Sequence, residues 1–309
     1  MRCTLVSCLV PQRGQDTVIK NLGGDAMVFE CSSKERVITV RMEDKPRINT
    51  NIYLISDAHF DSISCDRKVL KTHLDKALQE DALIIIGGDW YDAMQGKFDS
   101  RRNMNELRPE YRTEKYYDVV VDDSVKFLQP YAKNILAVLQ GNHELSVRRN
   151  SNTDLTDRLT FALRSFGSQA VTGNWNGWIK FILKVYHSTS SVKLYYSHNG
   201  ASGQSPVTRG VLSINKQATY EPDADIVWNG HTHTAYIMPV ARERLSSHGD
   251  PYYDIAWYVR TPGYKRDWEI ADGYVAQKGL GPQPIGCAKI NIYKEEGYPQ
   301  VNCNFEIVS

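Results

Sequence analysis

Hydrophobic positions follow two different periods in the first half of the chain. Three short apolar runs rich in Ile, Leu and Val predict buried strands, over residues 51–56, 82–87 and 134–140. Apolar residues recur at helical spacing in three other segments, over 66–82, 113–129 and 155–166. The last of these helices has three candidate cap residues, Ser151, Asn152 and Thr153. Strand and helix in alternation form β-α-β units, which predict a largely parallel sheet with helices packed on it.

The pattern changes in the second half, where strand-like runs are separated by Gly, Pro and Asn. The runs cover 175–187, 192–198, 224–231, 234–240, 252–259, 287–293 and 301–308. Asn176-Gly177 is typical of a two-residue hairpin turn. We therefore expect a second sheet, with further strands around 26–41 whose bounds stay open. The fold class predicted is α/β, a two-sheet β-sandwich flanked by helices.

The length of 309 residues allows one large core. No repeat, low-complexity tract or Pro/Ser-rich linker interrupts the chain, so we expect a single domain over 1–309. Within it, 1–50 is an N-terminal extension of open structure, 51–240 carries the motifs described below, and 241–309 is a C-terminal β-rich part. The 37 basic and 36 acidic residues nearly cancel, so overall charge indicates neither a nucleic-acid nor a membrane partner.

The chain has no run of about eighteen apolar residues, and its first residues lack the features of a secretory signal. No membrane partner is therefore expected. Six cysteines occur without any C-x-x-C pair, which favours free thiols in a reducing cytoplasm. The oligomeric state is left open by the sequence.

Residues of ligand type follow five of the predicted strands. They are Asp57 and His59, Asp89, Asn142 and His143, His198, and His231 with His233. In open α/β sheets the functional crevice lies at the carboxyl ends of the strands, so these side chains are expected to converge. Asp57 and His59 are two positions apart, as are His231 and His233. In an extended backbone the two members of each pair would also point the same way.

Carboxylate, amide and imidazole ligands without Cys suit Mn, Fe, Co or Zn rather than Ca or a structural zinc. A set of this size is too large for one catalytic metal, but it suits two metals that share a carboxylate. Two divalent ions bring four positive charges, and Asp57, Asp89 and a hydroxide between the ions remove three of them. The remaining local charge of about +1 attracts an anionic phosphate ester. The pair of ions also lowers the pKa of water from 15.7 towards about 7 and so supplies hydroxide at neutral pH.

The ordered series of motifs resembles the calcineurin-like metallophosphoesterases over about residues 51 to 240. It comprises Asp57-Ala-His59, Gly88-Asp89-Trp-Tyr-Asp92, Gly141-Asn142-His143-Glu144, Ser197-His198-Asn199-Gly200 and Gly230-His231-Thr-His233. The resemblance implies a four-layer α-β-β-α fold. It also implies two divalent ions, with manganese preferred and Fe, Zn, Co or Ni as alternatives.

The resemblance assigns roles to individual residues. One metal would be held by Asp57, His59, Asp89 and His233, and the other by Asp89, Asn142, His198 and His231, so that Asp89 bridges. The resemblance further implies that His143 stands over the phosphate as general acid, oriented by Asp92. The plainer alternative for Asp92 is a cap on the next segment.

The chain departs from the family pattern at several positions. Glu144 stands where many relatives have Asp, and Ala93 stands where protein-phosphatase members have an Arg that grips phosphate. Arg148 or Arg149 is the candidate substitute for that arginine. The stretches HNGASGQSPVTRG, GHTH and RTPGYK also resemble phosphoesterases found in phage genomes, which would place the protein in the host cytoplasm.

Segment 93–112 is an insertion that starts beside the expected site. It carries Arg101 and Arg102, which we expect to contact a polyanionic substrate, although a salt-bridged loop is the plainer interpretation. Among the other histidines, His73 lies on a predicted helix beside lysines and is expected to be solvated.

The function expected is metal-dependent hydrolysis of a phosphate ester, with a phosphodiester of nucleic acid or nucleotide as the favoured substrate. The alternatives are a small-molecule phosphomonoesterase and a metal-bound nucleic-acid-binding or scaffold protein with a vestigial site. A metallo-β-lactamase-like hydrolase is disfavoured, because Ala235 and Tyr236 stand where its Asp and His belong. An amidohydrolase-like enzyme would carry H-x-H on its first strand, where this chain has Asp-x-His.

Overall fold

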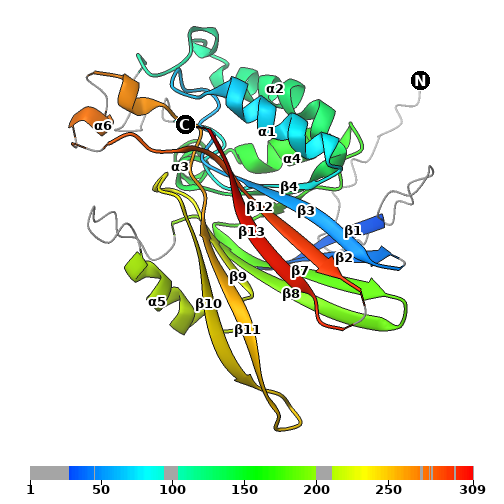
Figure 1. Ribbon diagram of the computed structural model, residues 1–309. Helices are drawn as coiled ribbons and strands as arrows, with labels where there is room; N and C mark the ends of the chain where they lie inside the picture. The colour runs from blue at the N-terminus through cyan, green and yellow to red at the C-terminus, as the bar shows by residue number, and fades with distance from the viewer. Residues whose placement is uncertain are drawn as a thin grey trace, which may run out of the picture.

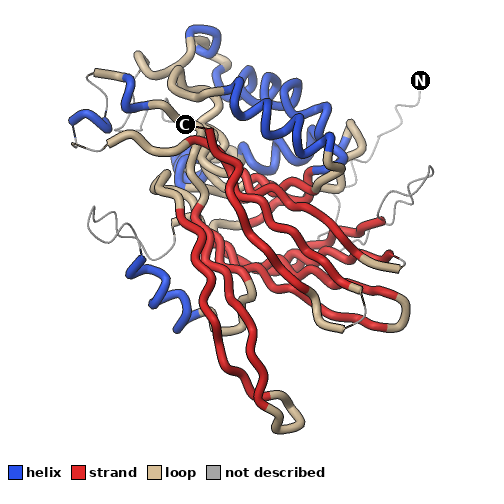
Figure 2. The backbone as a smooth tube through the Cα atoms, in the orientation of Figure 1, coloured by secondary structure: helices blue, strands red, loops and turns tan. Residues whose placement is uncertain are grey.

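Two sheets face each other, and helices lie on both outer faces (Figure 1). The computed structural model describes residues 28–44, 46–93, 104–199, 211–271, 274–277, 279, 281–295 and 297–308. Figure 2 shows the strands running roughly along one direction, with most of the helical structure gathered at one end and side of the sandwich. The α/β sandwich flanked by helices is thus confirmed.

The first sheet has six strands and contains the β-α-β units. Its order is β13 (Gln300–Val308), β12 (Ile285–Lys294), β3 (Ile48–Ile55), β4 (Leu83–Ile86), β5 (Ile135–Leu139) and β6 (Val171–Gly173). From β3 to β6 the pairing is parallel, whereas β12 and β13 add antiparallel strands at the β3 edge. The carboxyl ends of the β3, β4 and β5 strands therefore meet at one edge of the sheet.

The second sheet has seven strands and is mixed. Its order is β1 (Val28–Lys34), β2 (Val37–Asp44), β7 (Asn176–Val185), β8 (Ser188–Ser197), β9 (Ile226–Asn229), β11 (Pro251–Arg260) and β10 (Tyr236–Leu245). The two sheets do not divide the chain by halves, since β1 and β2 join this sheet and the last two strands join the other. The prediction of a turn at Asn176-Gly177 is wrong, because both residues pair with β8 at the start of β7.

Helices cover the two sheets unequally. The six-stranded sheet is covered by α1 (Arg67–Gln79), α2 (Tyr116–Leu128), η2 (Gln129–Asn134), α3 (Asn142–Ser151) and α4 (Leu155–Arg164), and the seven-stranded sheet by α5 (Val211–Tyr220). The remaining short helices are η1 (Pro109–Tyr111), η3 (Asp267–Glu269) and α6 (Tyr274–Gln277). Asp154, rather than the three expected residues, caps α4 by accepting hydrogen bonds from the backbone of Thr156 and Asp157. No helix in these described ranges has the length and hydropathy needed to cross a membrane.

The central strands are buried on both faces, which explains their continuous apolar runs. In β3, Tyr53 and Ile55 face the core under the helices, whereas Ile52 and Leu54 face the core between the sheets. This alternation follows from the period of two along a strand. Polar side chains of the site therefore lie beyond the strand ends, where the backbone leaves the sheet.

Candidate dinuclear metal centre

The ligand-type residues of all five motifs follow strands of the two sheets. Asp57 and His59 follow β3, Asp89 follows β4, and Asn142 begins α3 just after β5. His198 follows β8, and His231 and His233 follow β9. Their ligand atoms form two groups, Asp57 with His59 and His233, and Asp89 with His198 and His231, and within each group these atoms lie within 4.8 Å of one another.

In the first group the imidazoles face each other. Nε2 of His59 lies 3.3 Å from Nε2 of His233. Nε2 of His233 lies 3.6 Å from Oδ1 of Asp57. Three ligand atoms from two strand ends therefore surround one small space.

The second group centres on Asp89. Nε2 of His198 lies 3.0 Å from Oδ2 of Asp89 and 4.0 Å from Oδ1 of Asp57, so His198 spans the two groups. Oδ1 of Asn142 is buried and has no hydrogen-bond partner among the described residues. A buried amide oxygen without a donor is costly to desolvate, and a cation would satisfy it.

The backbone at the centre is left-handed rather than extended. Positive φ angles occur at Asp57 (54°), His59 (47°), Asp89 (57°), His231 (69°) and His233 (55°). We expected Asp57 and His59, and likewise His231 and His233, to point the same way because of strand alternation. This expectation is wrong, although both pairs contribute to the centre. Asp and His adopt this region more readily than most residues, and backbone strain of this kind gathers at functional sites.

Burial and mutual charge shift the pKa values in opposite directions. Burial raises the pKa of Asp57 to about 6. Burial alone would also raise the pKa of Asp89, but His143 and His198 lower it well below its ordinary value. Burial lowers the pKa of His59 to about 4 and also lowers that of His233, aided by the charges of His59 and Lys265. Two neutral imidazoles and one ionised carboxylate are the protonation states that metal binding requires.

These residues fit a pair of divalent ions. The donor set of carboxylates, imidazoles and one amide oxygen suits transition-metal ions, and the two groups are joined through Asp57, Asp89 and His198. A buried site with several acidic groups and an unpartnered amide oxygen is poorly satisfied by the protein alone. The arrangement favours cation binding over a structural role.

A family model for calcineurin-like phosphoesterases matches residues 50–235. The chain belongs to the calcineurin-like phosphoesterase family. It is accordingly a metal-dependent phosphoesterase, which agrees with the ligand groups at the strand ends. Among curated proteins, no significant match was found.

Solved structures that match this chain include three proteins at low identity. Vacuolar Protein Sorting 29 of Cryptosporidium parvum is 10% identical over 84% of this chain and 99% of its own, with a TM-score of 0.38. A dimetal phosphatase of Danio rerio is 9% identical over 82% and 98%, with a TM-score of 0.37. A metallophosphoesterase of Sphaerobacter thermophilus is 15% identical over 84% and 89%, with a TM-score of 0.32.

In this calcineurin-like phosphoesterase, Asp57 is held by the loops around it. Ser56 Oγ donates a hydrogen bond to Asp57 Oδ2 at 2.5 Å, and the backbone N–H of His231 donates to Oδ1 at 2.9 Å. Ser56 Oγ also lies 2.7 Å from Thr261 Oγ1. At Gly230, a Cβ would come within 2.4 Å of Asp57 Oδ2, so a glycine is required there.

Glu144 joins two of the motif loops. Its buried carboxylate accepts backbone hydrogen bonds from Asp89 (3.0 Å), Tyr91 (3.0 Å) and Gly141 (2.9 Å). Burial, together with the charge of Asp89, raises the pKa of Glu144 to about 7. Glu144, which departs from the common family pattern, therefore holds the loop of Asp89 against the start of α3.

Asp92 contacts both His59 and His143, by different atoms. Its carboxylate Oδ1 lies 2.7 Å from Nδ1 of His59, and its backbone carbonyl contacts Nδ1 of His143. The buried Lys265 Nζ lies 3.2 Å from the same Oδ1. Although burial opposes it, Lys265 and His59 lower the pKa of Asp92 well below its ordinary value. Asp92 caps none of the helices described, so a contact role explains it better than a cap.

The four arginines expected to bind substrate have different outcomes. Arg148 and Arg149 lie in the last turn of α3, and Arg148 NH1 lies 3.7 Å from Asp154 Oδ2 with 53% of its side chain exposed. They are placed at the opposite end of the helix from Asn142. Arg101 and Arg102 lie outside the described residues.

Several residues that build the site escaped the sequence analysis. Lys265, Thr261 and Gly263 lie in the loop after β11, within the RTPGYK stretch. A Cβ at Gly263 would come within 2.9 Å of the Asp57 carbonyl, which shows how closely this loop packs on the first motif. In the sequence, this part of the site was indicated only by the resemblance of the RTPGYK stretch, because the stretch contains no residue of ligand type.

Proposed function

We propose that this phosphoesterase hydrolyses phosphodiesters of nucleic acid or nucleotide form. The observation that carries the proposal is the meeting of two ligand groups around Asp57, Asp89 and His198, which fits a dinuclear centre. One ion would be held by Asp57, His59, Asp89 and His233, and the other by Asp89, Asn142, His198 and His231. Manganese is the preferred ion, with Fe, Zn, Co and Ni as alternatives.

When bound, the ions supply positive charge for the phosphate oxygens and a water of lowered pKa. His143 is proposed as the general acid. Its Nδ1 contacts the Asp92 carbonyl, which leaves Nε2 for a substrate, 3.6 Å from Asp89 Oδ2. Burial alone would lower the pKa of His143, but Asp89 and Asp92 raise it. The proton on Nε2 can then pass to the leaving oxygen.

Among the residues that the structure describes, few cationic side chains lie at the centre, which supports the preference for a diester. Ala93 stands where protein-phosphatase relatives carry a phosphate-gripping Arg, and Arg148 and Arg149 lie at the far end of α3. A diester carries one negative charge at phosphorus and a monoester carries up to two. With fewer cations to neutralise it, the singly charged group is the better match. The proposed setting is the cytoplasm, since Cys31, Cys65, Cys287 and Cys303 are free thiols.

The test combines metal analysis with a substrate panel. Elemental analysis of purified protein should find two divalent ions per chain, and chromogenic phosphodiesters should be hydrolysed faster than the matching monoesters. Asp89→Asn should lower the occupancy of both ions together, whereas His231→Ala should lower one. Loss of a single ion in Asp89→Asn would contradict the bridging role, and faster monoester turnover would contradict the diester preference.

A further inference from the structure

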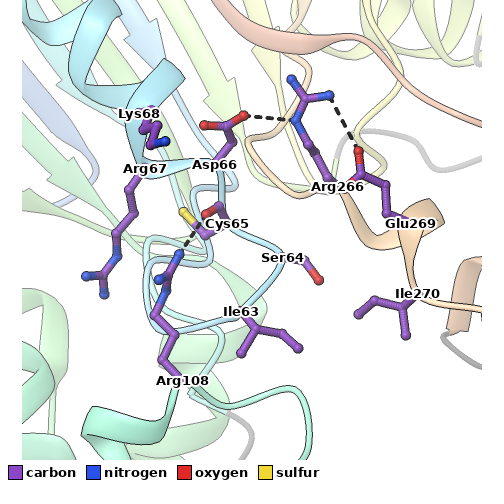
Figure 3. Close-up of a pocket in the computed structure, with 10 residues that line it drawn as sticks. All are labelled: Ile63, Ser64, Cys65, Asp66, Arg67, Lys68, Arg108, Arg266, Glu269 and Ile270. Carbon is purple, nitrogen blue, oxygen red and sulfur yellow. Dashed lines mark hydrogen bonds and ion pairs between the residues drawn. The ribbon is translucent and has the colours of Figure 1, made fainter.

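A hollow of about 440 Å³ is lined by residues that come before and within the start of α1 and by residues of the segment after β11 (Figure 3). One wall is the loop between β3 and α1, from Ile63 to Asp66, followed by the first turn of α1. Facing it are Arg266, Glu269 and Ile270. Its volume is within the range of small-ligand sites and is too large for a phosphate ion alone.

The hollow and the proposed centre are connected through one segment of the chain. Lys265 and Arg266 are consecutive, and their side chains go to opposite sides of the segment. Lys265 Nζ lies 3.2 Å from Asp92 Oδ1, whereas Arg266 Nε lies 2.9 Å from Asp66 Oδ2 in the wall of the hollow. Cys65, another lining residue, pairs with Lys265 in an isolated β-bridge. The Lys265–Arg266 segment therefore borders both the hollow and the contact between Asp92 and His59.

The charges in the lining are not balanced. Four lining residues are basic, Arg67, Lys68, Arg108 and Arg266, and two are acidic, Asp66 and Glu269. Both acidic groups pair with Arg266, at 2.9 Å and 3.8 Å. Among the described residues, Arg67 pairs instead with Asp123 and Glu110, at 3.3 Å and 3.9 Å.

Arg108 and Lys68 provide the excess positive charge. Arg108 donates to the carbonyls of Ser62 (3.0 Å) and Cys65 (2.8 Å), and it has no ion pair with a described carboxylate. Lys68 is exposed at the rim and has no ion pair within the described ranges. Carbonyl acceptors position a guanidinium without cancelling its charge, so the hollow presents a positive field.

The remaining lining suits a ligand with a polar and an apolar part. Ser64 Oγ is buried and has no hydrogen-bond partner in the described structure. Figure 3 shows Ile63 and Ile270 on the two sides of the same hollow, and 44% of Ile63 is exposed. A hydroxyl donor and two cations fit a phosphate, and a pair of isoleucines fits the flat or aliphatic group attached to it.

We propose that this hollow binds a second phosphate of the substrate, one nucleotide or more from the scissile group. The inference rests on the proposed function and narrows it to substrates with several phosphates, such as a single-stranded oligonucleotide. The scissile diester lies at the metal centre while the neighbouring phosphate lies at Lys68, Arg108 and Ser64. Affinity for the strand is then expected to depend on salt more steeply than affinity for a one-phosphate ester.

The test uses Lys68→Glu with Lys133→Glu as its matched control. Both changes alter the charge by the same amount at exposed residues, but Lys133 lies in η2, which leads into the amino end of β5 and so lies at the opposite edge of the sheet. An acidic residue in the first turn of α1 favours the helix, so Lys68→Glu is expected to fold. The substrates are bis-p-nitrophenyl phosphate, with one phosphate, and tetrathymidylate, with several.

Lys68→Glu should lower kcat/KM for tetrathymidylate about fivefold to tenfold through KM, with the chromogenic diester unchanged. The slope of log affinity against log salt should fall by about 0.7, one phosphate contact on a single strand. Equal effects of the two variants on tetrathymidylate, or equal losses on both substrates, would overturn the proposal. Anisotropy of fluorescein-labelled tetrathymidylate gives the same comparison without turnover. Absence of all hydrolysis would therefore refute the proposed function while leaving this binding test decisive.

Discussion

Individual residues at this centre are held in conformations that the chain would not adopt alone. Five of the proposed ligands have positive φ, a conformation that costs on the order of 1 kcal/mol or more for a residue with a side chain. Contacts from other loops hold them there, such as the His231 N–H on Asp57. Pre-ordered ligands lose less entropy when an ion binds, so the strain contributes to metal affinity.

His143 is the residue whose loss should separate chemistry from metal binding. His143→Ala removes the proposed proton donor but none of the proposed ligands. We expect two ions to be retained and kcat to fall by roughly 10²- to 10⁴-fold. Elemental analysis with chromogenic diester turnover measures both, and normal turnover in this variant would refute the acid role.

Lys265 should act on the metal centre through Asp92. Lys265→Met removes one of the two groups that hold Asp92 Oδ1, so the carboxylate should orient His59 less firmly and the ion proposed at Asp57, His59 and His233 should bind more weakly. We expect metal affinity or kcat to fall about tenfold to a hundredfold, with Lys265→Arg retaining part of it. Metal titration followed by turnover measures the effect.

Lys294→Met is the control for burying an altered lysine. Lys294 is 1% exposed and donates to Ser188 Oγ and the Gly297 carbonyl, away from the motif loops. It should lower stability without changing metal affinity. If both methionine variants lose metal equally, Lys265 has only a structural role.

At the scale of elements, the centre depends on loops that pack backbone against backbone. A Cβ at Gly88 would come within 2.3 Å of the Gly141 Cα, and one at Gly141 within 2.1 Å of Asp89 Oδ1. The loops after β4 and β5 therefore touch without side chains between them. Glu144 then closes the pair by accepting three backbone hydrogen bonds.

Glu144→Gln should open this junction. The amide offers one acceptor oxygen, and its NH₂ group faces backbone donors, so at least one buried N–H loses its partner at a cost of about 1–3 kcal/mol. We expect a lower urea midpoint and weaker binding of both ions that Asp89 is proposed to hold. Glu144→Asp, the residue found in many relatives, keeps both acceptors and should lose less; equal losses in the two variants would point to side-chain length instead.

At the scale of the whole molecule, the sequence predicted the ligand-type residues at the strand ends but not the residues from distant loops that contact them. Asp57 and Asp89 could be brought together from the sequence because the parallel strands β3 and β4 end at a common edge, whereas His198 follows β8 and reaches them from the other sheet. Lys265 could not be placed there, since it lies 32 residues beyond His233 on a loop whose position depends on how β11 joins the sheet. His73 was expected in solvent, but α1 turns it inwards, where its Nδ1 lies 3.0 Å from the Tyr264 hydroxyl.

The same reasoning limits what the sequence says about the sheets. Strand-like runs identified β12 and β13, and these neighbours in sequence pair with each other, but no local feature indicates that β12 also pairs with β3. Pairing over such distances is decided by the packing of whole elements. The helix α3 was missed for a related reason, because GNHE is polar and its helix is fixed by Glu144 rather than by an apolar stripe.

One carboxylate on the last strand of the six-stranded sheet forms ion pairs with two neighbouring elements. Glu306 on β13 lies 2.5 Å from Lys76 Nζ on α1 and 3.1 Å from Lys289 Nζ on β12, with 15% of its side chain exposed. Burial alone would raise the pKa of Glu306, but the two lysines lower it below its ordinary value. A lowered folded-state pKa adds stability above the unfolded-state value, about 4.3, and this stability is lost as pH falls through the folded value.

Glu306→Gln should therefore lower the free energy of unfolding by about 1 kcal/mol at pH 7, and the gap from the wild type should shrink towards pH 3. Urea unfolding at both pH values measures it. Glu43→Gln is the control, because Glu43 pairs with Lys184 at 2.9 Å while 55% exposed, and a solvent-screened pair should contribute little at either pH. If the difference in the free energy of unfolding between Glu306→Gln and the wild type stays the same from pH 7 to pH 3, packing rather than charge holds the last strand against α1.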